Sequence, residues 1–201
     1  MSDSSNLNNQ IDNPFQLFQE WYDLACQKEI NDPNAMSLAT VSDQGYPSLR
    51  IVLLKDFSDQ GFVFYTNLHS RKAEEIKHND KVALCFHWKS LVRSIRIEGQ
   101  ARNVSGDEAD HYFATRPRES QIGAWASHQS HSMFDYSDLI KKVESFKEKF
   151  GDGLIPRPEF WSGYRIIPHR IEFWQNQPFR LHKRVVFIKE ENQWSHHYLY
   201  P

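Results

Sequence analysis

The stretch that decides the fold, residues 50–72, reads RIVLLKDFSDQGFVFYTNLHSRK. Two apolar runs, residues 51–54 and 62–67, have the length of β-strands, and the turn sequence at residues 59–61 separates them. Ser70 then supplies the residue type that commonly precedes the first turn of a helix. This stretch therefore predicts two strands that lead into a helix.

Four cations flank these apolar runs: Arg50, Lys55, Arg71 and Lys72. Taken singly, each one is typical of a solvated strand end or a helix start. Taken together they indicate an anion, because an unpaired charge beside an apolar strand is costly to bury. Phosphate suits both a guanidinium and a helix N-terminus. The sequence alone leaves the identity of this anion open.

The rest of the chain predicts a mainly β fold. Expected strands lie at residues 36–41, 82–86, 94–98, 160–167, 170–174, 185–188 and 194–198, and expected helices begin at Pro14, Ser70, Ser105 and about Ser137. Gly99 is expected to mark a β-bulge. Because the strands come in hairpins and do not alternate with helices, an antiparallel barrel with peripheral helices is favoured over a parallel sheet.

Length and composition suggest one domain without a polyanionic partner. Residues 1–12 are polar and are predicted to form a disordered tail, which leaves residues 13–201 as a single domain. The net charge of -2 gives no reason to expect nucleic-acid or membrane binding. The N-terminus lacks the pattern of a signal peptide, so a cytoplasmic protein is expected. Cys26 and Cys85 lack metal-ligand spacing and are interpreted as small buried hydrophobes.

Two further clusters offer hydrogen-bond donors. The first comprises Tyr112, Arg116, Arg118 and Ser120, and the second is the run Arg180-Leu181-His182-Lys183-Arg184, which follows Trp174. An aromatic side chain beside basic ones suits a flat anionic ligand. No metal site is expected, since the histidines lack partners at ligand spacing. Glycine-rich phosphate loops are absent as well, so phosphate held by side chains favours FMN or a phosphorylated vitamin over ATP or NAD.

Seven sequence blocks in order resemble the pyridoxine/pyridoxamine 5′-phosphate oxidase family. They cover nearly the whole chain, and together they are far more specific than any one block. The blocks are RIVLLK at 50–55, FYTN at 64–67, SRK at 70–72, RPRESQIGAW at 116–125, QS at 129–130, IEFW at 171–174 and RLH at 180–182.

This resemblance implies a fold and a reaction. The expected fold is an FMN-binding split β-barrel, antiparallel and of Greek-key type, with FMN at a homodimer interface. The expected reaction is oxidation of pyridoxine 5′-phosphate or pyridoxamine 5′-phosphate to pyridoxal 5′-phosphate. Hydride would pass to the flavin N5, and O2 would be reduced to H2O2, while the protein orients both rings.

The resemblance also assigns site residues by matching position. Those expected to bind FMN are Arg50, Ile51, Val52, Leu53, Leu54, Lys55, Tyr65, Thr66, Arg71, Lys72, Ser94, Gln129, Ser130, Trp174 and Arg184. Those expected to bind the substrate are Lys55, Tyr112, Arg116, Ser120, Arg180, Leu181 and His182, with Arg180 and His182 also catalytic. No metal is expected.

Three departures from the family pattern keep alternatives open. Ser94 stands where the family usually has a glutamine that contacts the flavin, and Lys183 stands where it usually has aspartate. The N-terminal segment also lacks the basic-aromatic lid sequence of many members. One alternative is a related FMN-dependent oxidase of another flat metabolite, of phenazine type. The other is a non-catalytic protein that binds FMN or pyridoxal phosphate.

Overall fold

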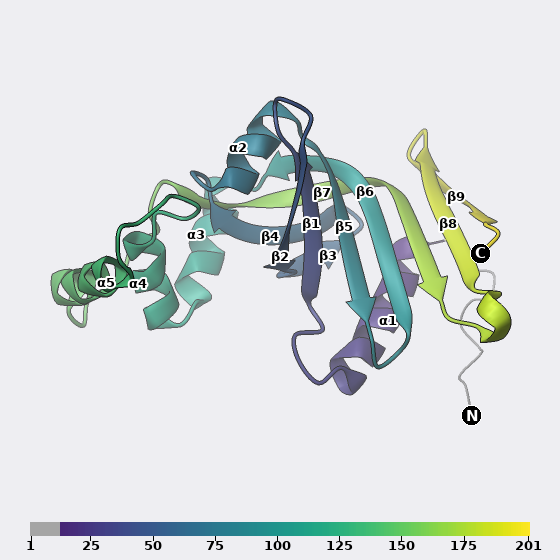
Figure 1. The fold of residues 1–201 in the computed structure, drawn as a ribbon, viewed down its shortest axis with the longest axis horizontal. Coiled ribbons are helices and arrows are strands. Elements are labelled where there is room, and N and C mark those ends of the chain that lie inside the picture. Colours follow the sequence, from purple (N-terminus) through teal and green to yellow (C-terminus); the bar gives the residue numbers. More distant parts are fainter. Residues whose placement is uncertain (1–12) are drawn as a thin grey trace.

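A computed structural model describes residues 13–201, so the tail predicted at residues 1–12 lies outside the described residues. Its strands form one curled sheet in the order β2-β1-β5-β6-β7-β4-β3, and a β8–β9 hairpin pairs with β7 (Figure 1). All of the strand pairs are antiparallel. The predicted antiparallel β fold with peripheral helices is therefore confirmed.

The elements have these bounds. The strands are β1 Ala35–Val41, β2 Pro47–Leu53, β3 Asp56–Ser58, β4 Gly61–Asn67, β5 Lys81–Trp88, β6 Arg93–Asn103, β7 Trp161–Gln175, β8 Lys183–Glu190 and β9 Gln193–Tyr198. The helices are α1 Pro14–Lys28, α2 Arg71–His78, α3 Gly106–Thr115, α4 Arg118–Ala126 and α5 Tyr136–Phe150, with a short 3-10 turn, η1, at Pro178–Arg180.

Helix α1 closes the main core. The side chain of Asn13 caps it by accepting the Phe15 N–H at 2.9 Å, and proline at the first helical position suits this start. Phe18 is fully buried, and its ring meets the rings of Phe62 and Phe86 edge-on at centroid distances of 4.9 and 5.3 Å. The core between α1 and the sheet is thus largely aromatic.

Strand β7 runs along the length of the sheet, from one end to the other. The sequence predicted two strands here, which is wrong, because the chain continues through Pro168 as a single strand of 15 residues. The bulge expected at Gly99 is confirmed, since the β6–β7 register shifts there. A Cβ at Gly99 would lie 2.4 Å from the Ile167 carbonyl oxygen, so only glycine permits this approach.

The helices α3, α4 and α5 form a group at one end of the sheet (Figure 1). Helix α3 begins as predicted, and the Ser105 hydroxyl accepts the Glu108 N–H at 3.1 Å. Helix α4 was not predicted, because a proline such as Pro117 commonly ends a helix such as α3. Proline also favours the start of a helix, and here it does both. The short strand β3 was missed as well.

One of the two cysteine predictions is wrong. Cys26 is exposed, because α1 turns its neighbour Ala25 towards the core instead, while Cys85 is half-buried on β5. None of the helices in residues 13–201 has both the length and the apolar character needed to cross a membrane.

Candidate active site

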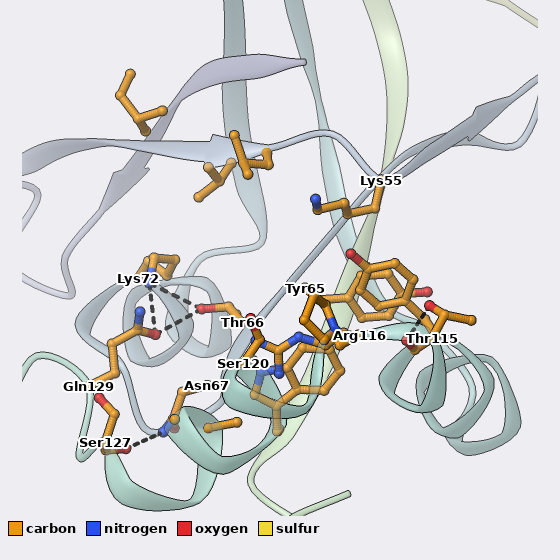
Figure 2. A pocket seen from close by; sticks show the side chains of 18 residues that line it. Lys55, Tyr65, Thr66, Asn67, Lys72, Thr115, Arg116, Ser120, Ser127 and Gln129 are labelled. Atoms are coloured by element: carbon orange, nitrogen blue, oxygen red, sulfur yellow. Dashed lines mark hydrogen bonds between the residues drawn. The ribbon is translucent and has the colours of Figure 1, made fainter. Parts of the chain in front are cut away.

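A cavity of about 620 Å³ opens between β2, β4, α3 and α4 (Figure 2). It brings together residues predicted for the cofactor and residues predicted for the substrate. The predicted residues that line it are Ile51, Val52, Leu53, Lys55, Tyr65, Thr66, Lys72, Tyr112, Arg116, Ser120 and Gln129. Stretches far apart in the sequence therefore meet at one site.

Lys72 supplies a buried cation at one side of the cavity. Its side chain is only 7% exposed, and its ammonium donates to Thr66 Oγ1 at 3.1 Å, Ser70 Oγ at 3.2 Å and Gln129 Oε1 at 3.3 Å. Burial and the nearby Arg50 lower the pKa of Lys72 to about 8. No carboxylate in residues 13–201 pairs with it. This arrangement fits a bound anion, which would restore the stability of the charged form.

Helix α2 adds its N-terminus to the same side. The Ser70 hydroxyl accepts from Lys72 and does not cap the helix. The start of α2 therefore has no side-chain cap, and Lys72 in its first turn lines the cavity. Helix N-termini favour negative charge, so both features serve the same ligand chemistry.

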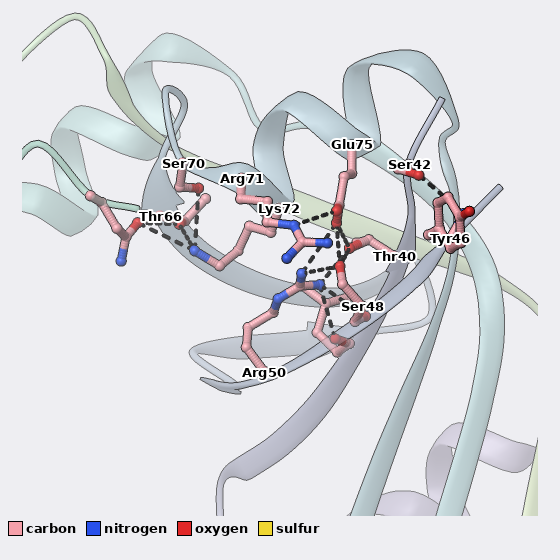
Figure 3. A network of polar contacts seen from close by, with 12 residues as sticks. Thr40, Ser42, Tyr46, Ser48, Arg50, Thr66, Ser70, Arg71, Lys72 and Glu75 are labelled. Carbon is pink, nitrogen blue, oxygen red and sulfur yellow. Dashed lines mark hydrogen bonds and ion pairs between the residues drawn. The ribbon is translucent and has the colours of Figure 1, made fainter. Parts of the chain in front are cut away.

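Glu75, which was not predicted as a site residue, pairs with two of the other three cations of this stretch (Figure 3). It is 6% exposed and pairs with Arg50 at 3.2 Å and with Arg71 at 2.8 Å. Burial favours its neutral form, but hydrogen bonds from Ser48, Thr40 and both arginines prevail and lower the pKa of Glu75 to about 2. The i, i+4 spacing of Arg71 and Glu75 was the available sequence signal.

Arg50 consequently lies beside the cavity and does not line it. Its guanidinium also donates to the Leu38 carbonyl at 3.2 Å and to the hydroxyls of Thr40 and Ser48. Arg50 therefore ties β2 to β1 and α2. Arg50 also lies near Lys72 (Figure 3), and its positive charge helps to lower the pKa of that lysine.

Stacked aromatic rings form one wall of the cavity. Tyr65 stacks on Tyr112 with ring centroids 4.0 Å apart and on Trp161 at 5.4 Å. A Cβ at Gly163 would lie 2.7 Å from the Tyr65 ring, so this glycine makes room for the stack. Burial and the nearby Glu108 raise the pKa of Tyr65 to about 12, which keeps its phenol protonated.

Arg116 supplies cationic character on another side of the cavity, where Lys55 also lies (Figure 2). Its guanidinium carbon lies 4.6 Å from the centroid of the Trp161 ring, and its Nη1 is buried without a hydrogen-bond partner among the described residues. Burial lowers the pKa of Arg116. A buried, unpartnered guanidinium nitrogen fits an anionic ligand that enters the cavity.

Several predicted residues lie elsewhere. Arg118, which the sequence grouped with Arg116, turns away and donates to the Gly151 and Gly153 carbonyls after α5. Leu54 is buried in the main core, and Ser130 lies next to Gln129 at the left-handed φ of 70°.

The remaining predicted residues form a second group at the opposite end of the sheet. Ser94 on β6 pairs with Trp174 on β7, which pairs with Arg184 on β8, so the three occupy one row across neighbouring strands. The Trp174 and His182 rings lie 4.7 Å apart. Arg180 is exposed in η1 and has a left-handed φ of 62°, a conformation rare outside glycine.

The two groups cannot meet within one chain. Trp161 at the start of β7 lines the cavity, whereas Trp174 near its end belongs to the second group. A strand of this length spans on the order of 45 Å at about 3.3 Å per residue. Figure 1 shows α3 and α4 at one end of the molecule and the turn between β7 and β8 at the other.

Two family models match this chain. Residues 23–150 match the model described as "Pyridoxamine 5'-phosphate oxidase", and residues 161–201 match the "Pyridoxine 5'-phosphate oxidase C-terminal dimerisation region". The chain is 51% identical over 203 residues to pyridoxine/pyridoxamine 5'-phosphate oxidases from Brucella canis and Brucella suis. Each alignment covers 100% of both chains.

Solved structures share the fold. PhzG from Burkholderia lata, in complex with tetrahydrophenazine-1-carboxylic acid, superposes with a TM-score of 0.90 at 29% identity, covering 96% of this chain and 95% of that chain. A pyridoxamine 5'-phosphate oxidase-related, FMN-binding protein from Nostoc punctiforme superposes with a TM-score of 0.76 at 14% identity, covering 94% and 98%. With matches along nearly its whole length, this chain belongs to the pyridoxamine 5'-phosphate oxidase family.

Proposed function

We propose that this protein is an FMN-dependent oxidase that converts pyridoxine 5′-phosphate or pyridoxamine 5′-phosphate to pyridoxal 5′-phosphate. Oxygen is the final acceptor and is reduced to H2O2, and with the amine substrate one water is consumed and ammonia is released. Relatives that carry this name are 51% identical over the whole chain. The observation that carries the proposal is a single cavity with two separate cationic sides, Lys72 on one and Arg116 with Lys55 on the other.

The Lys72 side fits the phosphate of FMN. A buried ammonium without an acidic partner in the described residues lies at the start of a helix, and Thr66 and Gln129 add polar groups. When bound, FMN would accept the hydride, which carries both electrons of the oxidation, and these two electrons would reduce O2 to H2O2. The residues of the chain bind FMN, orient it and exclude water around it.

The Arg116 side fits the phosphate of the substrate. Arg116 offers the unpartnered Nη1, Lys55 an exposed ammonium, and Tyr112 and Ser120 offer hydroxyls. A guanidinium and a lysine beside hydroxyl donors match a phosphomonoester well. Holding this phosphate fixes the position of the substrate ring, and proximity and orientation supply much of the rate acceleration.

We further propose that a second copy of this chain completes the site. Residues 161–201 match a dimerisation region, and the second group of predicted residues lies in it. Strand β2 is an edge strand whose outer face exposes Leu49, Ile51 and Leu53, and the last two also line the cavity. An apolar row on an edge strand is normally covered. The partner's second group would then face this cavity.

Arg180 and His182 would act on the substrate ring from that second copy. His182 Nδ1 accepts the Gln177 backbone N–H at 3.3 Å, so Nε2 is the nitrogen left to exchange a proton. The ring of Trp174 packs against the imidazole of His182. Arg180 lies in a turn, and its backbone has a positive φ. Such a strained backbone persists only where the surrounding structure enforces it.

The phenazine-type alternative has one observation in its favour, the high structural similarity to PhzG. The identity to that protein is 29%, against 51% to the vitamin B6 phosphate oxidases. A carboxylate also pairs with arginine, but a phosphomonoester has more charge and one more terminal oxygen to accept from Lys55, Tyr112, Arg116 and Ser120. The phosphorylated substrate is therefore preferred.

An aerobic assay tests the proposal. Purified protein should be yellow, and should convert pyridoxine 5′-phosphate or pyridoxamine 5′-phosphate to pyridoxal 5′-phosphate with one H2O2 per turnover. Unphosphorylated pyridoxine is the matched control substrate and should react poorly. Colourless protein that ignores added FMN, or bound FMN without turnover, would contradict the proposal.

We also propose that residues 13–201 form a single domain and that the protein is cytoplasmic. Residues 13–201 contribute to one continuous sheet, which supports a single domain, and limited proteolysis should leave this part intact. The cytoplasmic location is testable by cell fractionation.

A further inference from the structure

We infer that Glu172 is a positioning residue for the cofactor, because it holds the guanidinium of Arg184 in the orientation needed to bind FMN. This inference rests on the proposed function and extends it to Glu172, which is not among the predicted site residues. Glu172 lies on β7 and is only 1% exposed. It would act through Arg184 and would not touch the cofactor itself.

Three arginines surround this one carboxylate. Glu172 Oε1 accepts from Arg96 Nη2 and Arg184 Nη2, both at 2.8 Å, and Oε2 accepts from Arg170 Nη2 at 2.9 Å. We call these four residues the Glu172 cluster. Burial favours the neutral carboxyl, but the arginines prevail and lower the pKa of Glu172. The carboxylate is therefore charged and fully engaged.

Arg184 is held at three of its five N–H donors. Its Nε and Nη2 both donate to Glu172 Oε1 at 2.8 Å, and Nη1 donates to the Tyr200 carbonyl at 3.0 Å. The guanidinium plane is thereby fixed, and one N–H on each Nη remains for a ligand. Because Arg184 pairs with Trp174 across β7 and β8, these donors belong to the row that contains Ser94 and Trp174.

The charge balance also favours a ligand-binding role. The Glu172 cluster carries three positive charges and one negative charge, and Glu98, which pairs with Arg170 at 2.8 Å, adds one more negative charge. The sum of +3 and -2 leaves +1. Water screens the Arg96 and Glu98 side chains, which are 45% and 47% exposed, whereas Arg184 at 23% is less screened. An electron-rich ligand beside the row would balance this surplus charge.

A double-mutant cycle on FMN affinity tests this inference. FMN is titrated into cofactor-free wild-type protein, Glu172→Gln, Arg184→Lys and the double variant, and flavin fluorescence reports the Kd. Glu172→Gln should raise the Kd about tenfold, the effect of losing one charged hydrogen-bond partner. If Glu172 acts through Arg184, the double variant should bind no more weakly than the weaker single variant.

Glu98→Gln is the matched control. It removes the other carboxylate that pairs with the Glu172 cluster, but that carboxylate pairs with Arg170 and its side chain is 47% exposed. Its Kd for FMN should stay within about twofold of wild type. If Glu172→Gln does not fold, Glu172→Asp replaces it in the same cycle, with the same criterion.

The outcomes separate this inference from the proposed function. Wild-type protein that does not bind FMN overturns both. Wild-type protein that binds FMN, with a Glu172 variant that binds equally well, overturns only the inference. Additive effects in the cycle, or an equal loss in Glu98→Gln, would also overturn it, because Glu172 would then act on stability or general charge.

Discussion

Replacing Lys72 with methionine tests the central electrostatic feature of the cavity. Methionine keeps the approximate length of the side chain and removes its charge. In the folded protein without FMN, the pKa of Lys72 is about 8, against an ordinary value of 10.5. This difference corresponds to on the order of 3 kcal/mol of folding free energy.

The sign of this contribution is unfavourable. Because the folded state binds the proton less tightly than the unfolded state, the cost is fully present below about pH 8. It is relieved as the pH rises from there towards 10.5. The stability advantage of cofactor-free Lys72→Met over wild type should therefore shrink by on the order of 3 kcal/mol between pH 7 and pH 10.5.

Bound FMN should make wild type more stable than Lys72→Met, the reverse of the order without FMN. A phosphate beside Lys72 compensates its charge in wild type, whereas Lys72→Met should bind FMN about 30-fold more weakly or worse. Denaturant unfolding at several pH values measures the stability difference, and flavin fluorescence measures the affinity. Lys77→Met, an exposed lysine on the same helix, is the control and should change neither. A pH-independent difference, or wild-type FMN affinity in Lys72→Met, would refute the reasoning.

Three further predictions follow from the same geometry. Arg116→Ala should raise KM for pyridoxine 5′-phosphate at least about tenfold while FMN stays bound. Steady-state kinetics and the flavin content of the variant measure this, and loss of FMN from the variant would contradict it. Arg180→Ala should impair turnover more than FMN retention, and Lys72→Ala the reverse. Mixing the two impaired chains should restore about a quarter of wild-type activity, because random reassociation makes half of the dimers mixed and one of the two sites in each mixed dimer is intact; no recovery would argue against a site shared between two copies. The pKa of Glu75 is about 2, so the stability that its charge contributes is fully present above its ordinary pKa of 4.5 and is lost as the pH falls towards 2. The stabilities of wild type and Glu75→Gln, measured by acid unfolding, should therefore converge between these pH values, and a constant difference would argue against this role.

Local patterns in the sequence were sufficient for most of the fold. Most of the apolar runs, the helix starts at Pro14 and Ser105 and the Gly99 bulge could be predicted from neighbouring residues, and these are confirmed. The predictions that are wrong or missing depend on more distant contacts. The single strand β7 continues through Pro168 because β6 bulges opposite it, and Pro117 both ends α3 and begins α4.

The candidate site divides in the same way. Residue types alone indicated phosphate held by side chains, and the ordered blocks indicated the family. Tertiary structure decided which cations are available: Glu75 engages Arg50 and Arg71, Lys72 has only neutral partners among the described residues, and Arg118 turns away.

Neither buried carboxylate was visible in the sequence as part of the site. Counting cations along the chain does not show which of them a distant glutamate binds, and Glu172 meets Arg96 only through strand pairing. The separation of the two groups along β7 is likewise a property of the folded strand. The sequence therefore specifies the chemistry of this site, while the division of its residues between two ends of the sheet arises from tertiary structure, because charge partners are set by distance in space and not along the chain.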